Sequence, residues 1–303
     1  MDQIAYHSKH GGLWIDRLDW RAELDRRSAH GLVDRTLADR IVSFVDKGFI
    51  ILEGAAAPAA VDAFQERLAR AFRQGDKRML YQHPGDPNSQ PLKAGTERLG
   101  TRVVDAFVAA PEALTLFQSP ALMQFLTAIF AEAPLLFQSL SFDQGSGQGL
   151  HQDTAYVVVD KPLELAACWI ALEDVKPGSG ELMYLPGSHR YPDFDFGPGR
   201  KHWNGEVDGN EPHDRWSLWL REEGDRRGLE LETFRARKGD ILIWHADLAH
   251  GGVPIQDRSL TRQSLVGHFC PASRKPHYFS YLPDRRTIRA AGQLRYSSMY
   301  YAL

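Results

Sequence analysis

Residues 239–252 read GDILIWHADLAHGG. This short apolar run follows a Gly-Asp pair and ends at two glycines. Similar runs lie on both sides of it from Pro134 onward: LLFQSLSF, AYVVV, ELAACWIAL, ELMYL, LETFRA and RQSLVGHF. Clusters of Gly, Pro and Asp separate them, and many short strands divided by turn residues are typical of an antiparallel sandwich or barrel. The sequence therefore predicts a β core over residues 133–270.

The part of the chain before this core has a different periodicity. Apolar residues recur at helix spacing over residues 37–48, 61–72 and 112–131, whereas FIIL at 49–52 is typical of a short buried strand. The polar, Pro- and Gly-bearing stretch at 81–100 is predicted to be a loop, and its length favours a functional role. The fold class that we expect is mainly β with helical additions: a barrel with N-terminal helices packed on it.

The chain of 303 residues is long enough for one large core, and we expect a single catalytic domain over residues 1–303. It would comprise a mostly helical part (1–132), the β core (133–270) and a C-terminal extension (271–303). Within the core, residues 191–230 carry many charges together with Trp and His side chains. We expect this segment to be an insertion that covers the barrel mouth as a lid.

Composition argues against several classes of function. The formal net charge is -3, so nothing draws the protein as a whole toward nucleic acid or an anionic membrane surface. The two cysteines, Cys168 and Cys270, lie in apolar stretches as small core residues do, and no disulfide framework is expected. The N-terminus, MDQIAYHSKHGG, has no apolar run preceded by positive charge, and no stretch reaches the length of a bilayer. We therefore expect a cytoplasmic protein that binds neither nucleic acid nor membrane.

A metal site is indicated by His151 and Asp153, which stand two residues apart. In an extended strand such residues point to the same face, so both side chains can reach one ion. The segment at 239–252 offers a third ligand, either His245 or His250. Two histidines and one carboxylate on one face of an ion leave three positions open, as in iron(II) enzymes that bind a co-substrate and dioxygen. Zinc is more usually held tetrahedrally.

Five segments follow one another in a characteristic order: LHQD at 150–153, CWIALEDV at 168–175, GELMYLPGSHR at 180–190, GDILIWHADLAHGG at 239–252 and RQSLVGHF at 262–269. In these segments the chain resembles the phytanoyl-CoA dioxygenase family of iron(II)- and 2-oxoglutarate-dependent oxygenases. The resemblance implies a double-stranded β-helix, a jelly-roll or cupin-like barrel, with iron between its two sheets. It gives the ligand roles to His151, Asp153 and His250, and it leaves His245 as a buried structural residue.

A 2-oxoglutarate site needs a cation for the distal carboxylate, and an arginine can hold two oxygens at once. Arg258 lies in the turn-like IQDRS and is expected to be solvated, whereas Arg262 begins an alternating strand on which Ser264 shares its face. The resemblance supports Arg262 and Ser264 as the carboxylate clamp. Trp169 and Gln138 lie on predicted inner strands and resemble family positions that line the cofactor pocket, although ordinary core packing explains Trp169 equally well.

The resemblance implies hydroxylation of an unactivated C–H bond of a small molecule by dioxygen, with 2-oxoglutarate converted to succinate and carbon dioxide. A halogenating relative would need an open coordination site in place of the carboxylate of Asp153, so the presence of this residue favours hydroxylation. Desaturation and ring formation stay open as outcomes of the same chemistry.

We expect the substrate to meet the elements that cover the barrel mouth, at 81–105 and 191–230. Their polar and aromatic side chains suit an anionic or amphipathic small molecule: Arg98, Arg102, Lys201, His202, Trp203 and Arg215. The alternative is a solvated loop with one or two tryptophans packed on the barrel.

Two other classes of protein stay open at this point. A cupin-like binding protein, whose metal is structural or absent, would need no cation on the strand after His250, so the predicted clamp counts against it. A redox-inert metal enzyme on the same barrel, such as an isomerase or hydrolase, would need a third histidine or a carboxylate base. His189, His245 and His268 are available for that role.

Overall fold

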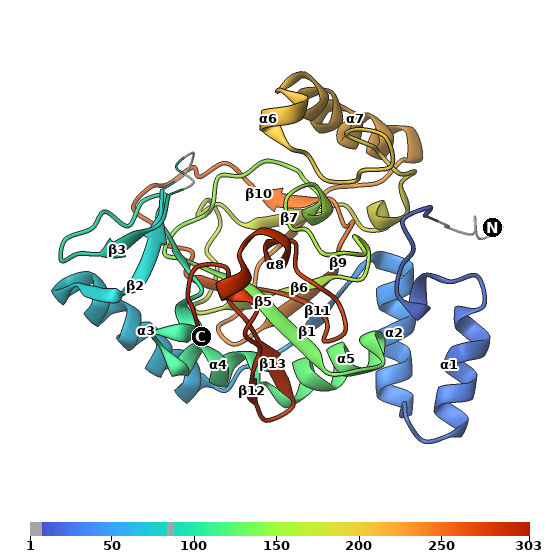
Figure 1. Ribbon diagram of the computed structural model, residues 1–303, viewed down its shortest axis with the longest axis horizontal. Helices are drawn as coiled ribbons and strands as arrows, with labels where there is room; N and C mark the ends of the chain where they lie inside the picture. The colour runs from blue at the N-terminus through green and yellow to red at the C-terminus, as the bar shows by residue number, and fades with distance from the viewer. Residues whose placement is uncertain (1–7, 84–85, 87) are drawn as a thin grey trace.

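The computed structural model describes residues 8–83, 86 and 88–303, and it places two sheets face to face with helices outside them (Figure 1). The neighbouring strands of the larger sheet follow the order β1 (Phe49–Leu52), β9 (Ile241–His245), β6 (Ala166–Ala171), β11 (Ser264–Pro271), β5 (Pro134–Phe142), β4 (Arg102–Val104), β2 (Asp76–Gln82) and β3 (Gln90–Leu92). β13 (Leu294–Tyr296) pairs parallel with β5 and antiparallel with β12 (Arg289–Ala291). The smaller sheet is formed by β10 (His250–Gly252), β7 (Leu182–Tyr184) and β8 (Glu232–Phe234).

Most helices precede the barrel strands in the chain, and two lie in the segment between β7 and β8. The α-helices are α1 (Trp20–Ala29), α2 (Arg35–Lys47), α3 (Pro58–Gln74), α4 (Pro111–Phe117), α5 (Pro120–Phe130), α6 (Gly205–Asp208), α7 (Glu211–Arg227) and α8 (Tyr278–Tyr281). Short 3-10 turns are η1 (Trp14–Asp16), η2 (Ala106–Val108), η3 (Asp153–Ala155), η4 (Ser188–Arg190) and η5 (Pro283–Arg285). The predicted class, a mainly β barrel of two sheets with helices packed on it, is confirmed.

Local sequence signals set the ends of the helices beside the core. The side chain of Asp34 caps α2 by accepting from the backbone N–H of Leu37, and Gly48, with a φ of 82°, ends the helix in the left-handed region. The helical stretch expected over 112–131 is two helices, because Pro120 has no N–H with which to continue α4. Among the described residues no single helix has the length and hydropathy to cross a membrane; α4 and α5 do so only as a pair bent by 63°.

The larger sheet separates two apolar layers. On its outer face, α2 to α5 pack against residues such as Cys168 and Ile170 of β6. On its inner face, Trp169 of β6 and Trp244 of β9 pack against side chains of the smaller sheet, among them Tyr184. All six residues of β6 are buried, because alternate side chains enter one layer or the other. The predicted site residues lie on or beside the inner face.

Two expectations need correction. AYVVV at 155–159 is not a strand: the N–H of Val157 bonds back to the carbonyl of Asp153, and the described backbone there makes only an isolated bridge at Val159. The tight turn after Asp153 therefore overrides the β propensity of the valines. The stretch expected to be a loop at 81–100 contains β3, which pairs with β2; residues 84, 85 and 87 of it, like the first seven residues, lie outside the described part. The insertion at 191–230 is largely helical, and its role as a lid stays a prediction, as does the division of the domain.

Candidate metal centre

The three predicted ligands lie together at the edge of the smaller sheet. His151 and His250 form an antiparallel bridge in which the N–H of each donates to the carbonyl of the other, at 2.8 and 2.9 Å. Nε2 of His250 lies 3.6 Å, and Nε2 of His151 3.9 Å, from Oδ1 of Asp153. In the described part of the chain this is the one cluster of three or more His, Cys, Asp or Glu residues whose ligand atoms all lie within 4.8 Å of one another.

The route to this convergence differs from the expected one. Asp153 does not continue a strand from His151 but begins η3, and it is the bridge to β10 that brings His250 beside both. Gly251 is essential to the approach of the two segments, because a Cβ on it would lie 2.6 Å from the carbonyl oxygen of Gly149. Only a residue without a side chain allows this spacing.

Hydrogen bonds orient each ligand. Nδ1–H of His151 donates to the carbonyl of Gly149 at 2.8 Å, and Nδ1–H of His250 donates to that of Leu248 at 2.9 Å. Both bonds keep the proton on Nδ1 and leave the lone pair of Nε2 for a metal ion. The indole N–H of Trp244 donates to Oδ2 of Asp153 at 2.8 Å, so Oδ1 is the oxygen turned toward the imidazoles.

The electrostatics of the cluster also suit a divalent cation. Burial and the neighbouring imidazole of His250 lower the pKa of His151 to about 3, so its ring is neutral and able to ligate at neutral pH. Burial alone would raise the pKa of Asp153, but the imidazoles of His250 and His268 outweigh it and hold the pKa well below its usual range. The carboxylate of Asp153 is therefore charged, and neither it nor His151 must lose a proton to bind a metal ion.

A second group of polar atoms lies on β6, at the start of β11 and just before it; Arg262, which was expected to begin a strand, lies two residues before β11. Arg262 is 2% exposed, its Nη1 donates to the carbonyl of Gly180 at 2.7 Å, and its guanidinium lies 5.7 Å from the ring of Trp169. Nε of Arg262, Oγ of Ser264 and Nε1 of Trp169 are all buried without a hydrogen-bond partner among the described residues. Buried polar atoms are normally hydrogen-bonded, so three unpartnered ones on β6, on β11 and just before β11 fit a polar ligand.

The charge of Arg262 points to the nature of that ligand. No described carboxylate forms an ion pair with it, and Glu181 acts on it only at longer range. Burial lowers the pKa of the guanidinium to about 10, which leaves it cationic at neutral pH. A buried cation without a counterion is costly, and an anion such as the distal carboxylate of 2-oxoglutarate would offset the cost. Gln138 faces His268 across β5 and β11, and its side chain hydrogen-bonds to Tyr300; its place in the cofactor pocket stays a prediction.

The histidines considered as alternatives lie in different places. His245 accepts at Nδ1 from the backbone N–H of Asp247, and its Nε2 lies 3.3 Å from Oδ1 of Asp16, so it links segments of the fold. Nε2 of His189 is bonded to the carbonyl of Val45, outside the cluster. His268 lies closer than expected, with Nε2 3.6 Å from Oδ2 of Asp153. Alternation in RQSLVGHF puts it on the face of Ser264, a signal from which its position could have been predicted.

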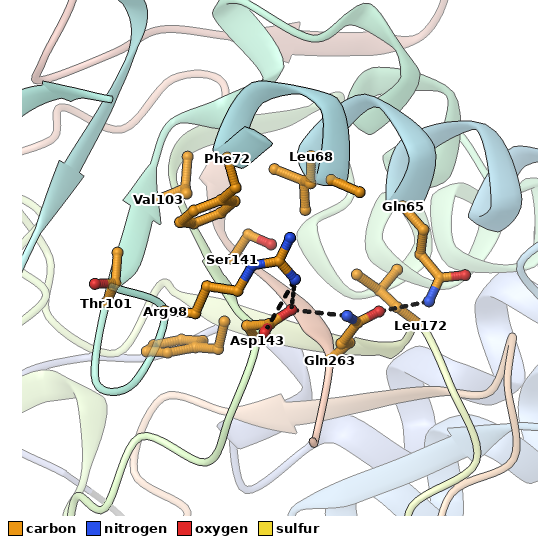
Figure 2. A pocket seen from close by; sticks show the side chains of 12 residues that line it. Gln65, Leu68, Phe72, Arg98, Thr101, Val103, Ser141, Asp143, Leu172 and Gln263 are labelled. Atoms are coloured by element: carbon orange, nitrogen blue, oxygen red, sulfur yellow. Dashed lines mark hydrogen bonds and ion pairs between the residues drawn. The ribbon is translucent and has the colours of Figure 1, made fainter. Parts of the chain in front are cut away.

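Most cations expected at the mouth already have partners. Figure 2 shows Arg98 and Gln263 converging on Asp143, with Nη1 of Arg98 3.2 Å from the carboxylate and Nε2 of Gln263 donating to it at 2.7 Å. The small cavity beside them is lined by Leu68 and Phe72 of α3, so it lies on the helical side of the sheet.

The remaining mouth residues form two groups. Arg102 donates to Gln82, Arg215 pairs with Glu211, and Lys201 is buried between Asp193 and Asp247. The aromatic residues instead gather near the cluster. Tyr156 has its ring 5.8 Å from the ring of His151, and it is in turn contacted by the rings of Trp203, His213 and Trp216. The ring of His202 lies elsewhere, against His277. Tyr156 is 39% exposed, and sequence reasoning missed it.

Several solved structures are similar to this chain in fold, and other proteins are similar to it in sequence. A crystal structure of the non-heme alpha ketoglutarate dependent carbocyclase SnoK from nogalamycin biosynthesis superposes with a TM-score of 0.61, at 16% identity over 80% of this chain and 90% of that one. EctD from S. alaskensis with 2-oxoglutarate and 5-hydroxyectoine gives a TM-score of 0.56, at 16% identity over 81% of this chain and 79% of that one. The peroxisomal phytanoyl-CoA dioxygenase of Homo sapiens is 25% identical over 258 residues, which are 78% of this chain and 68% of that protein.

Fold, triad and a match to a family model together define the class of iron- and 2-oxoglutarate-dependent oxygenases. Residues 44–260 match the family described as Phytanoyl-CoA dioxygenase (PhyH), which is more than half of the chain. The chain belongs to this family. The resemblance read from the five sequence segments is therefore confirmed.

Proposed function

We propose that the protein is an iron(II)- and 2-oxoglutarate-dependent dioxygenase that hydroxylates an unactivated C–H bond of a small molecule. His151, Asp153 and His250 would hold the iron, and Arg262 would anchor the distal carboxylate of 2-oxoglutarate. The observation that carries the proposal is the buried guanidinium of Arg262, which no described carboxylate pairs and which lies just before β11 of the sheet that also presents Trp244 to Asp153. A metal-binding protein without an anionic co-substrate has no use for such a charge.

Bound together, iron and 2-oxoglutarate would activate dioxygen: one oxygen atom would oxidise 2-oxoglutarate to succinate and carbon dioxide, and the other would enter the C–H bond of the substrate. The residues of the chain position the metal ligands and the co-substrate, and they shield the reacting atoms from water. Gly149, Leu248 and Trp244 orient the three ligands through hydrogen bonds. Arg262 and the two orphaned donors beside it would orient the co-substrate. The burial of the triad keeps bulk water from the reacting atoms.

Relatives with this fold do not all catalyse the same reaction. They include an epimerase, SnoN, and a carbocyclase, SnoK, both described as alpha ketoglutarate dependent, besides EctD, which was crystallised with 5-hydroxyectoine. The carboxylate of Asp153 occupies the position that a halogenating enzyme would leave open. Among the remaining outcomes we propose hydroxylation, because it needs no more from the protein than a target carbon held beside the metal.

Two of the cations expected at the barrel mouth are already paired with carboxylates of the chain. We therefore favour an amphipathic substrate over an anionic one. Arg98 and Lys201 are held by carboxylates, whereas Tyr156 and Trp203 offer ring surface beside His151. Aromatic faces bind apolar ring or chain surface, and the hydroxyl of Tyr156, bonded to His213 at 2.6 Å, adds a polar edge. A substrate with an apolar body and few charges fits this wall. A cytoplasmic location stays a prediction from the sequence.

The test is anaerobic titration of the metal-free protein with iron(II) and then 2-oxoglutarate, followed by absorption spectroscopy. A visible charge-transfer band that needs both components, and that decays with succinate formation when oxygen enters, is the expected result. His151→Ala and Asp153→Ala proteins, folded by circular dichroism, serve as controls and should bind iron much more weakly. Tight metal binding without the band would favour the redox-inert enzyme or the cupin-like binding protein instead.

A further inference from the structure

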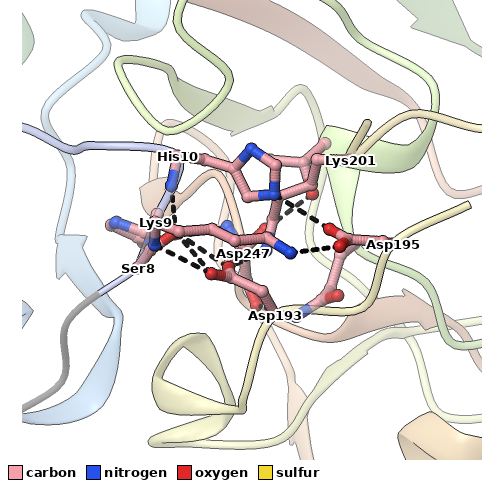
Figure 3. A network of polar contacts seen from close by, with 10 residues as sticks. Ser8, Lys9, His10, Asp193, Asp195, Lys201 and Asp247 are labelled. Atoms are coloured by element: carbon pink, nitrogen blue, oxygen red, sulfur yellow. Dashed lines mark hydrogen bonds and ion pairs between the residues drawn. The ribbon is translucent and has the colours of Figure 1, made fainter. Parts of the chain in front are cut away.

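A polar network joins the N-terminal segment, the insertion and the turn before His250, and in it Lys201 contacts both Asp193 and Asp247 (Figure 3). The side chain of Lys201 is 4% exposed, and its Nζ lies 2.6 Å from Oδ2 of Asp247 and 2.9 Å from Oδ1 of Asp193. Burial opposes a charge there, but the two carboxylates outweigh burial and raise the pKa of Lys201 above its usual value. The ammonium group therefore neutralises carboxylates that have left water.

Asp247 connects Lys201 to both segments that carry predicted ligands. It lies in the turn between β9 and β10, three residues before His250. Its Oδ1 accepts from Oγ1 of Thr154 at 2.6 Å, and its backbone carbonyl accepts from Nε2 of Gln152 at 2.8 Å. These donors flank Asp153 in the chain. One aspartate thus joins the segment of His151 and Asp153 to the segment of His250.

The other side of the network belongs to the insertion and to the N-terminal segment. Asp193, which precedes Lys201 in the insertion, accepts from Oγ of Ser8 at 2.8 Å and from the backbone N–H of Lys9 at 3.0 Å. The backbone N–H of Trp203 donates at 3.0 Å to the carbonyl of Ala155, the last residue of η3. The insertion is therefore bound to the metal-bearing segment by main chain as well as by charge.

We propose that Lys201 is a positioning residue for the metal centre, which couples docking of the insertion at 191–230 to the spacing of His151, Asp153 and His250. The inference rests on the proposed function, because it presumes that these three residues hold a metal. When the insertion is docked, Lys201 compensates the charge of Asp247, and Asp247 can hold Thr154 in place. When the insertion leaves, Asp247 loses its ion pair with Lys201, and the segment that carries Asp153 loses part of its support.

A purely structural role for Lys201 would change stability but not the metal site, so the deciding measurement is metal binding. Cobalt(II) titration of the metal-free protein reports both affinity and, through its d–d absorption, ligand geometry. Lys201→Met should weaken cobalt binding about 10- to 100-fold, the usual effect of losing a group that orients the ligands of a metal. The intensity or position of the d–d bands should change with it. Lys9→Ala is the matched control, because it removes only a partly exposed ion pair with Asp195 at the rim of the same network.

Thr154→Val is the second variant, since it removes the bond to Asp247 without stripping a buried charge of its partner. It should weaken cobalt binding several-fold while the protein stays folded, and it decides the matter alone if Lys201→Met does not fold. Parental affinity and parental d–d bands in the folded variants would overturn the positioning role. Failure of the parent itself to bind cobalt would instead overturn the proposed function, and with it this inference. The His151→Ala protein gives the cobalt affinity expected when the metal site is lost.

Discussion

Replacing Arg262 by methionine separates a co-substrate anchor from an ordinary core residue. Methionine keeps much of the length and apolar surface of the stem but removes the charge and its donors. Removing one partner of a buried, hydrogen-bonded charge pair costs about 2–5 kcal/mol. At about 1.4 kcal/mol for each tenfold change, the affinity for 2-oxoglutarate should fall roughly 30-fold to 3,000-fold. Iron(II) affinity should change little, because Arg262 touches none of the three ligands.

Stability should respond differently from affinity. Without co-substrate, Arg262 is a buried cation whose pKa burial lowers to about 10, and its one strong bond is to the carbonyl of Gly180. The variant loses that bond, about 1–2 kcal/mol, but is relieved of an uncompensated charge of at least comparable cost. The unfolding temperature of the co-substrate-free variant should therefore stay close to that of the parent. The rise in unfolding temperature that 2-oxoglutarate gives the metal-loaded parent should be lost.

The assay is titration of the iron(II) protein with 2-oxoglutarate under nitrogen, followed by the charge-transfer band, with thermal unfolding measured in parallel. Arg258→Ala is the matched control, because Arg258 is exposed and belongs to the same loop between β10 and β11. It should keep parental affinity. If Arg262→Met bound 2-oxoglutarate as tightly as the parent, Arg262 would not be the anchor, and the orphaned donors beside it would need another explanation.

The remaining predictions concern backbone approach, buried charge and the mouth. Gly251→Ala should abolish tight metal binding, because the added Cβ would lie 2.6 Å from the carbonyl oxygen of Gly149. Gly252→Ala is the control and should bind cobalt(II) normally, because its Cβ would meet nothing closer than 3.6 Å. Equal cobalt(II) affinities of the two variants would refute the steric argument. Burial raises the pKa of Asp105 from 3.8 to about 7, so the folded protein favours the protonated carboxyl. The contribution of this group to stability is therefore fully present below about pH 4 and is lost as the pH rises toward 7. In urea titrations Asp105→Asn should therefore gain unfolding free energy relative to the parent between about pH 5 and 8, by at most about 4 kcal/mol; a gap that does not change with pH would contradict this. Trp203→Ala should alter how much succinate forms per substrate oxidised, and an unchanged ratio would leave Trp203 as a packing residue.

The elements of the barrel could be predicted wherever the local pattern agrees with the burial that the fold imposes. The apolar runs that became β5, β6, β9 and β11 are buried along their length or on alternate faces, and the sequence shows this directly. AYVVV at 155–159 has equal β propensity, but the turn after Asp153 depends on a bridge between residues 151 and 250, which are 99 positions apart. No local pattern reveals a contact of that range. His268 marks an intermediate case, since alternation gives its face but not its distance from Asp153.

The cations of the mouth show most clearly why residue type alone misleads. Arg98, Arg102 and Lys201 were expected to meet an anionic or amphipathic ligand, yet Arg98 pairs with Asp143 and Lys201 with Asp247, each about 45 residues away in the chain. An exposed arginine and one already neutralised by a distant carboxylate look identical in sequence, although only the first can attract an anion. Arg262 presents the reverse situation, because it is buried and no described carboxylate pairs with it. The absence of a protein counterion, which only the folded arrangement reveals, is what distinguishes a binding cation from a structural one.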